Sequence, residues 1–343
     1  MKKVLLLVLV MLVSALAAAC GNSESNEEAG GSSGDGGETS NGSETSEGSD
    51  SSGGGDLKIG ISLPSATHGW MGALIDNAES KAQEIEEASG VEYIMTNAED
   101  PNTQANDVNN LISQDVDAIV MLPIESAALS PVGQQVKEAD IPLVVVDREL
   151  DNDAADVVVK GDNQGIGVNA GEYFVEQLNG EGNVVEITGP PNSVTEQRGS
   201  GFQEAVESED GMEIVASQSG DFSKEKSLEV MQNILQAQPE IDAVFTQDDG
   251  MALGVQQAVK EAERDDIQFI TGAGGSKEVF ESIQDGGLIQ ATFLYSPTMV
   301  RDGVQIAADI AQGEEPEESM VIKEATQVTE ENVEEFYNPD SKY

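Results

Sequence analysis

Charged and aromatic side chains stand at the ends of several apolar runs, and their types suit the binding of hydroxyl groups. Asp147 and Arg148 directly follow one such run, and Asp248 follows another. A carboxylate accepts two hydroxyls while a guanidinium donates a planar fork, so Asp147 beside Arg148 suits a vicinal diol. Trp70 offers a flat apolar face for the C–H side of a sugar ring, and Phe222 can close the other side. These side chains predict a site for a polyhydroxylated molecule.

Most of these residues also have an interpretation without a ligand. Asp147 and Arg148 can form a salt bridge at a strand end, and Trp70 can be core packing. Asp248 or its neighbour Asp249 can be a helix N-cap, a role that is compatible with ligand contact.

The two remaining polar candidates are Arg198 and His68. Arg198 can be a solvated residue of a first helical turn, and His68 can position its loop. Because His68 is the only histidine and the chain has one cysteine, no second partner exists for a zinc site or for a nucleophile with its activating base.

Short apolar runs rich in β-branched residues alternate with segments of helical spacing, such as the one that holds Leu74, Ala78 and Ile85. Runs that are apolar throughout are typical of strands covered on both faces, so the alternation predicts an α/β fold with doubly wound parallel sheets. The predicted strands are residues 57–62, 91–96, 118–122, 141–147, 157–160, 183–188, 213–217, 243–247, 268–272 and 289–294.

The part of the chain after residue 56 is longer than one core usually serves, which favours two lobes over a single ten-stranded sheet. In open parallel sheets, ligands bind beyond the carboxyl ends of the strands. The candidates at these ends are Ser62, His68, Trp70, Glu125, Asp147, Arg148, Arg198, Phe222, Asp248, the turn at 272–276 and Tyr295.

Glycines after the 157–160 run imitate a dinucleotide-binding fingerprint. Gly165, Gly167 and Gly171 follow that run, and Glu186 comes 21 residues after Gly165. The spacing departs from the fingerprint, and Asp162 would set a carboxylate near a pyrophosphate. Helix capping and close backbone packing therefore explain the glycines better than an NAD-dependent surface oxidoreductase does.

Two further loops partly resemble motifs that bind a cofactor or a metal ion. Residues 272–277 lack the spacing of a phosphate-cradling loop, so a tight turn that lets the backbone approach a ligand is favoured. The acidic loop at 151–156 lacks the glycine and the terminal glutamate of a calcium loop. We therefore expect neither a cofactor nor a metal.

The N-terminal residues have the order of a bacterial secretion signal that ends at a lipid-attachment cysteine. Lys2 and Lys3 precede an apolar run, and small residues lead to Cys20, the only cysteine. A lone thiol cannot form an internal disulfide, so acyl chains are its expected use. There are two alternatives: cleavage after residues 17–19 with ordinary secretion and no lipid, or an apolar segment that stays uncleaved as a membrane anchor. Residues 1–19 are thus expected to be a signal peptide.

After Cys20 the composition becomes Gly/Ser-rich and acidic, which predicts a disordered tether over 20–56. The formal net charge of the chain is −49, from 16 basic and 65 acidic residues. Such a surface repels phosphates and anionic headgroups, so nucleic acid and direct headgroup contact are excluded as partners. We interpret the acidic residues as keeping the protein surface solvated in a salty or alkaline habitat.

Three stretches are similar to a known family: 141–148 (IPLVVVDR), 197–202 (QRGSGF) and 243–254 (AVFTQDDGMALG). The chain resembles the type I substrate-binding proteins of ABC importers, which include ribose- and galactose-binding proteins. The resemblance implies two Rossmann-like lobes joined by three crossovers, with sugar between them and a membrane permease as partner. The implied lobes are 57–161 with 296–324 and 162–295 with 325–343. Asp147, Arg148, Arg198, Phe222 and Asp248 match the family's ligand-contacting positions.

The chain departs from the ribose binders at several positions. Leu122 replaces an Asn, the stretch 69–71 replaces a pair of Phe, and Asp248 replaces another Asn. Gly274 replaces an Asp, and Tyr295 replaces a Gln. Smaller residues at two of these positions predict a roomier pocket, for a hexose, a furanose or a sugar alcohol.

The sequence thus predicts a non-catalytic, monomeric, lipid-anchored extracytoplasmic protein that binds a neutral sugar or polyol for an ABC permease. Neutrality follows because Asp147, Asp248 and Glu125 balance or exceed Arg148 and Arg198. A ligand-presenting sensor of the same fold is the alternative within the binding class. The predicted ligand-binding residues are Ser62, His68, Trp70, Met71, Glu125, Asp147, Arg148, Arg198, Phe222, Asp248, Gly274 and Tyr295.

Overall fold

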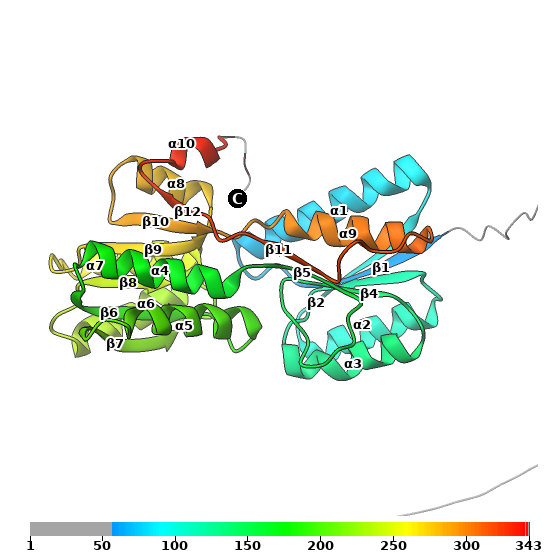
Figure 1. The fold of residues 1–343 in the computed structure, drawn as a ribbon, viewed down its shortest axis with the longest axis horizontal. Coiled ribbons are helices and arrows are strands. Elements are labelled where there is room, and N and C mark those ends of the chain that lie inside the picture. Colours follow the sequence, from blue (N-terminus) through cyan, green and yellow to red (C-terminus); the bar gives the residue numbers. More distant parts are fainter. Residues whose placement is uncertain (1–56, 340, 342) are drawn as a thin grey trace, which may run out of the picture. The chain divides into compact units, whose positions relative to one another are not determined.

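Two six-stranded sheets organise the described residues (Figure 1). The computed structural model describes residues 57–339, 341 and 343, so the predicted signal peptide, Cys20 and the tether lie outside it. The strand order is β11-β5-β4-β3-β1-β2 in the first sheet and β12-β10-β9-β8-β6-β7 in the second. All neighbours are parallel except β12, which is antiparallel to β10. Two parallel-sheet α/β lobes are confirmed, and the single ten-stranded sheet is wrong.

The strands are β1 (Lys58–Pro64), β2 (Glu92–Ala98), β3 (Ala118–Met121), β4 (Leu143–Val146), β5 (Val157–Gly161), β6 (Glu181–Thr188), β7 (Gly211–Ser219), β8 (Ala243–Thr246), β9 (Phe269–Gly274), β10 (Ile289–Leu294), β11 (Met320–Lys323) and β12 (Gln327–Thr329). The helices are α1 (Gly69–Ser89), α2 (Pro101–Ser113), α3 (Ser126–Glu138), α4 (Asn163–Gln177), α5 (Ser193–Val206), α6 (Lys224–Ala237), α7 (Asp249–Glu261), α8 (Lys277–Gln284), α9 (Met299–Ala311) and α10 (Val333–Phe336).

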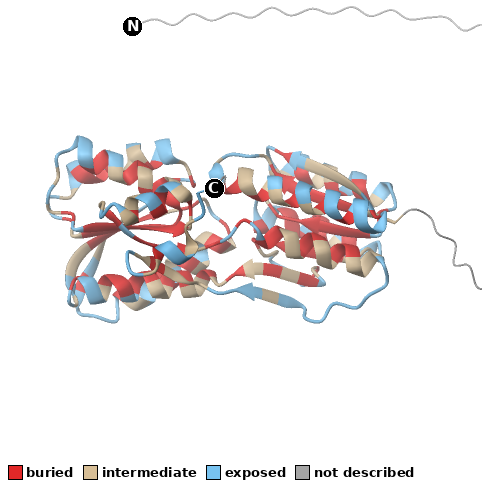
Figure 2. Ribbon diagram, turned by 90° about the horizontal axis from the view of Figure 1, so that it is seen from above, coloured by how far each residue is buried: buried red, intermediate tan, exposed pale blue. Residues whose placement is uncertain are grey.

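Alternate residues of one strand pack on opposite faces of a sheet. In β4, Val144 and Val146 belong to a core with residues of α1 and α9, whereas Leu143 and Val145 belong to a separate core with residues of α2 and α3. Buried residues therefore fill the strands and the inner faces of the helices (Figure 2). All ten predicted strands are confirmed. Central strands such as β3, β4 and β8 are fully buried, and a strand covered on both faces must be apolar throughout.

The strands β11 and β12 were not predicted. They have only four and three residues, and Met320 and Ile322 of β11 are 42% and 51% exposed at a sheet edge. The chain passes between the sheets after β5, after β10 and between β11 and β12. The residue bounds of the two lobes stay a prediction.

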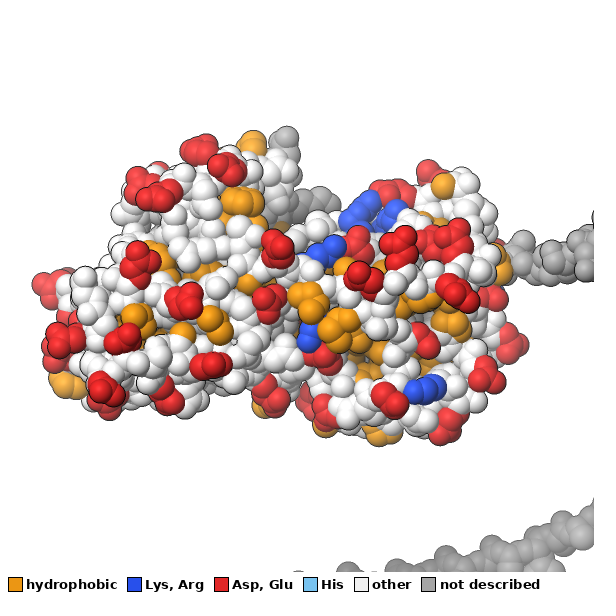
Figure 3. All heavy atoms as spheres, in the orientation of Figure 1, with side chains coloured by type: hydrophobic (Ala, Val, Ile, Leu, Met, Phe, Trp, Pro, Cys, Tyr) orange, Lys and Arg blue, Asp and Glu red, His pale blue; other side chains and the backbone are white. Residues whose placement is uncertain are grey.

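Acidic side chains are spread over the face drawn in Figure 3, with few Lys and Arg among them. The strongly negative surface expected from the net charge of −49 is thus visible on the folded part. Within the part that the structure describes, no helix is long and apolar enough to cross a membrane.

Candidate ligand-binding site

A cavity lies where loops of both sheets meet. The contributing segments follow β1 and β4 in the first sheet and lie at or beyond the ends of β6, β7, β8, β9 and β10 in the second. All of them are at carboxyl ends of strands, where an open parallel sheet binds its ligands. The lining residues are His68, Trp70, Asp147, Arg148, Val194, Arg198, Phe222, Asp248, Ala273 and Tyr295.

Asp147 and Arg148 form one wall of this cavity. Asp147 directly follows β4 in a left-handed conformation, with φ at 69°. Arg148 Nε lies 3.5 Å from an Asp147 carboxylate oxygen, and Arg148 Nη1 donates to the carbonyls of Pro123 at 3.2 Å and Ile124 at 2.7 Å. Burial raises the pKa of Asp147 above its ordinary value, although the charge of Arg148 opposes the shift. The pair is therefore both a strand-end salt bridge and part of the cavity wall.

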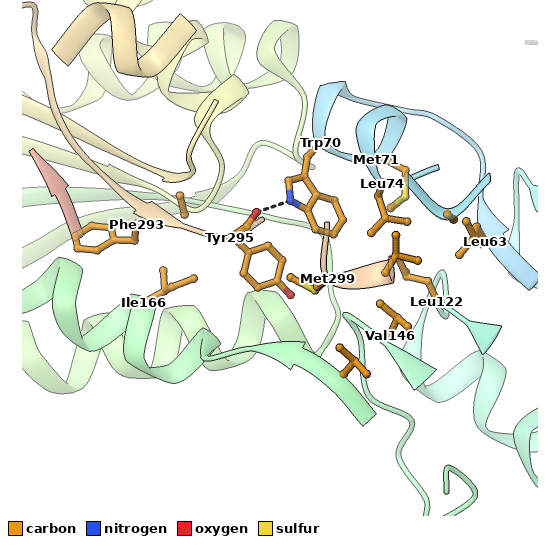
Figure 4. Packing of buried hydrophobic residues seen from close by; sticks show 14 of the residues in the cluster. Leu63, Trp70, Met71, Leu74, Leu122, Val146, Ile166, Phe293, Tyr295 and Met299 are labelled. Carbon is orange, nitrogen blue, oxygen red and sulfur yellow. Dashed lines mark hydrogen bonds between the residues drawn. The ribbon is translucent and has the colours of Figure 1, made fainter. Parts of the chain in front are cut away.

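Tyr295 directly follows β10 and lines the cavity. Its hydroxyl donates to Asp147, and its ring is stacked against Trp70 with centroids 5.3 Å apart. Trp70 Nε1 in turn donates to the Tyr295 carbonyl oxygen at 2.6 Å (Figure 4). Trp70 belongs to the first core and also lines the cavity, so its packing and its predicted binding role coexist.

Arg198 is buried and held by neutral partners. Its Nε donates to Asn163 Oδ1 at 3.0 Å, and its Nη1 donates to the Gln247 carbonyl at 2.5 Å. The guanidinium carbon lies 4.2 Å from the centroid of the Tyr295 ring, a distance typical of a cation–π contact. The Nη2 atom has no hydrogen-bond partner among the described residues. Arg198 is thus fixed in place with one donor group unused, and it is not a solvated helix residue.

Asp248 caps α7 and lines the cavity at once. Its Oδ1 accepts a hydrogen bond from Met251 N at 3.1 Å. Burial and the neighbouring carboxylate of Asp249 raise the pKa of Asp248 to about 7, against an opposing effect of Arg198. Near neutral pH, Asp248 can therefore donate as well as accept a hydrogen bond.

The turn after β9 binds an internal carboxylate. Gly275 N and Ser276 N donate to Asp249 Oδ2 at 2.7 and 2.6 Å, and the Thr292 hydroxyl donates to Asp249 Oδ1 at 2.6 Å. Asp249 thus takes up two backbone donors of the turn, while Ala273 lines the cavity, and the expectation that this backbone approaches a ligand stays a prediction.

His68 and Phe222 close the outer side of the cavity. Their ring centroids are 5.8 Å apart, and His68 also stacks on Trp70 at 6.3 Å. Burial, and then the charge of Arg148, lower the pKa of His68 to about 4, so the imidazole is neutral at physiological pH. Its Nδ1 has no hydrogen-bond partner in the described part of the chain.

Four predicted residues do not line this cavity. Ser62 is fully buried within β1, and Met71 packs in the core beside Leu74 (Figure 4). Glu125 is exposed. It is the N-cap residue of α3, and its side chain makes no capping hydrogen bond. Gly274 ends β9, where its carbonyl accepts from Tyr295 N at 2.9 Å.

The pocket is not roomier at the two substituted positions. A Cβ atom at Gly274 would lie 2.2 Å from the hydroxyl oxygen of Tyr343, and one at Gly69 would lie 3.8 Å from the Tyr343 ring. Tyr343 thus occupies the space next to both glycines. The inner cavity measures about 20 Å³, but a hollow of about 430 Å³ adjoins it and shares His68, Trp70, Phe222 and Asp248.

Sequence reasoning missed four residues near the cavity. Val194 and Ala273 line it, and apolar side chains at strand ends carry no distinctive signal. Asn163 and Gln247 orient Arg198, and Gln247 Nε2 also donates to the buried Glu186 at 2.8 Å. Their positions at a helix start and directly after β8 are the only signals that could have found them.

The glycines of the dinucleotide-like pattern serve capping and packing, as the sequence favoured. Gly165 N donates to Asp162 Oδ1 at 2.8 Å. A Cβ at Gly167 would lie 2.1 Å from the Arg198 carbonyl oxygen, and one at Gly171 would lie 2.5 Å from Ala205, so α4 and α5 touch through their backbones. Among the residues described here, no three His, Cys, Asp or Glu side chains are grouped to hold a metal ion.

Comparisons with known proteins agree with this fold. The sequence profile of a family described as periplasmic binding protein domain matches residues 59–315. The ribose import binding protein of Bacillus subtilis is 31% identical over 265 residues, covering 76% of this chain and 84% of its own. The galactofuranose-binding protein of Escherichia coli is 32% identical over 241 residues, covering 67% and 74%. A solute binding protein of an ABC transporter from Bacillus halodurans, crystallised with myo-inositol, has a TM-score of 0.78 at 27% identity and covers 85% and 100%.

Proposed function

Because the chain belongs to the periplasmic binding protein family, we propose that it is the substrate-binding protein of an ABC importer and captures a neutral monosaccharide or polyol. The lobes, residues 57–161 with 296–324 and 162–295 with 325–343, close over the ligand and present it to a membrane permease. The protein acts outside the cytoplasm as a monomer, without catalysis.

The observation that carries this proposal is the set of hydrogen-bonding groups around the cavity. Two carboxyl groups, of Asp147 and Asp248, face two guanidinium groups, of Arg148 and Arg198. Together they supply acceptors and forked donors for hydroxyls, while the indole of Trp70 supplies an apolar face. Glu125 is exposed and lies outside the cavity, so it does not belong to this set. A neutral ligand with many hydroxyls fits such a wall better than an anion.

Thermal unfolding in the presence of candidate ligands tests the function directly. We expect one of D-ribose, D-galactose, D-fructose, xylitol or myo-inositol to stabilise the protein by about 2.7 kcal/mol at 100 times its dissociation constant. That gain raises Tm by roughly 2–4 °C for each kcal/mol. D-Galacturonate and NAD, as controls, are expected to leave Tm unchanged. Stabilisation by the anionic sugar or by NAD, with no response to any neutral compound, would refute the proposal.

The lipid anchor is a second part of this proposal. Cleavage before Cys20 lets its thiol and the new amino terminus carry acyl chains, which hold the protein at the membrane surface. In cells, the wild-type protein is expected in the membrane fraction and Cys20→Ser in the soluble extracytoplasmic fraction or the medium. Ser14→Ala, a change in the same segment that keeps the thiol, serves as the control. Equal membrane association of Cys20→Ser and the wild type would rule the anchor out.

A further inference from the structure

Tyr343 lies at the hollow that adjoins the inner cavity, although it is far in sequence from the other lining residues. It shares this hollow with His68, Trp70, Phe222 and Asp248, all of which also line the inner cavity. Its side chain therefore lines the same hollow as predicted ligand-binding groups of both sheets.

Backbone contacts hold the segment that carries Tyr343. Lys277 Nζ donates to the Pro339 carbonyl at 2.5 Å, and Ser341 N donates to the Asn338 carbonyl at 3.1 Å. Tyr343 N donates to the Ser341 hydroxyl at 3.2 Å, and that hydroxyl donates to the Tyr343 carbonyl. Hydrogen bonds to the main chain thus hold the described residues Pro339 and Tyr343.

Gly274 makes room for the tyrosine, and Gly69 lies beside its ring. A Cβ at Gly274 would lie 2.2 Å from the Tyr343 hydroxyl oxygen, and Gly274 also has φ at +155°, where other residues are strained. A Cβ at Gly69 would lie 3.8 Å from the Tyr343 ring. One glycine comes from the start of α1 and the other from the end of β9, so the tyrosine bridges elements that pack with different sheets.

The Tyr343 hydroxyl is buried and has no hydrogen-bond partner among the described residues. Burial, followed by the charges of Asp249 and Asp248, raises its pKa well above the ordinary value, so the group remains a neutral donor. Arg198 Nη2 and His68 Nδ1 are also buried without partners in the described chain. Leaving such groups unpaired costs free energy that a hydroxylated ligand would recover.

We propose that Tyr343 is a ligand-binding residue of this cavity. Its hydroxyl donates to a hydroxyl of the bound sugar or polyol, and its ring closes the wall between Gly69 and Gly274. This inference rests on the function proposed above and assigns to it a contact that lies outside the residues predicted from the sequence.

Titration calorimetry with the neutral compound that stabilises the wild type tests this contact. Tyr343→Phe removes one oxygen and is expected to weaken binding about tenfold, as the loss of one buried hydrogen bond does. Tyr343→Ala also removes the ring and is expected to weaken binding about 100-fold. Tyr337→Phe is the matched control, because the Tyr337 hydroxyl donates to Glu281 at 3.0 Å on the exposed surface. Its affinity should stay within about twofold of the wild type.

Deoxy analogues of the same compound separate a direct contact from a structural effect. On the wild type, the analogue that lacks the contacted hydroxyl is expected to bind about tenfold more weakly than the parent compound. On Tyr343→Phe, the same analogue and the parent compound are expected to bind equally tightly. Unchanged affinity of Tyr343→Phe for the parent compound would overturn the inference alone. Tighter binding by Tyr343→Ala would also overturn it, since the side chain would then obstruct the cavity. A wild type that binds no neutral compound would overturn the proposed function together with this contact.

Discussion

Arg198→Met is expected to weaken ligand binding at least about 100-fold, or about 2.8 kcal/mol, because truncating a buried charged hydrogen-bonding group costs about 2–5 kcal/mol. The guanidinium is fixed by Asn163 Oδ1 at 3.0 Å, by the Gln247 carbonyl at 2.5 Å and by the Tyr295 ring at 4.2 Å. Its remaining Nη2 group is buried and free among the described residues, so it is poised to donate to the ligand. Titration calorimetry measures the loss.

Two further variants make this result interpretable. Arg301→Met removes an arginine whose Nη2 donates to both carboxylate oxygens of Glu84 at 2.8 and 2.7 Å on the surface, and it should bind ligand normally. Arg198→Lys keeps the charge without the planar fork, so an intermediate loss of about tenfold is expected. If Arg198→Met stays folded and binds as tightly as the wild type, Arg198 has no direct role in recognition.

The sheets could be predicted from the sequence, because a strand that is buried on both faces must be apolar throughout. The runs at 118–122 and 243–247 illustrate this, since β3 and β8 are fully buried. The edge strand β11 escaped prediction for the converse reason: it is short and mostly exposed. The topology then predicts the position of the ligand site, because parallel strands bring their carboxyl ends to one edge of the sheet.

Most charged and aromatic residues of the cavity could be predicted, including Trp70, Phe222 and Tyr295, but Tyr343 could not. Asp147, Arg148, Arg198 and Asp248 all line the cavity or hold its wall, as their positions after strands implied. Tyr343, by contrast, follows no strand of the doubly wound pattern, and its contact with Gly69 and Gly274 arises only from tertiary folding. A glycine in the sequence therefore does not by itself predict an empty space in the pocket, because a residue distant in the chain, here Tyr343, can occupy that space.

Adjacent aspartates at the start of α7 should respond to substitution in opposite directions. Asp249→Ala is expected to lower the free energy of unfolding by about 3 kcal/mol, since each buried donor left unpaired costs about 1–3 kcal/mol. Three donors lose their acceptor: Gly275 N, Ser276 N and the Thr292 hydroxyl. Removing a buried carboxylate offsets part of that cost. Urea unfolding at pH 7 measures the difference.

Asp248→Asn is the matched control, because asparagine is as good an N-cap as aspartate. The Asp248 carboxyl keeps its proton up to a pKa of about 7 in the folded protein, whereas the unfolded chain releases it near the ordinary value of 3.8. Stability therefore falls as pH rises between these values, by up to about 1.4 kcal/mol per pH unit, and the loss is complete above pH 7. Asp248→Asn should remove this slope and be more stable than the wild type at pH 8. A residual slope is expected from Asp147, Asp249 and Glu186, whose pKa values burial also raises. If Asp248→Asn and Asp249→Ala destabilise the protein equally at pH 8, ionising the Asp248 carboxyl costs no free energy of folding. That result would contradict the effect expected from its burial beside Asp249.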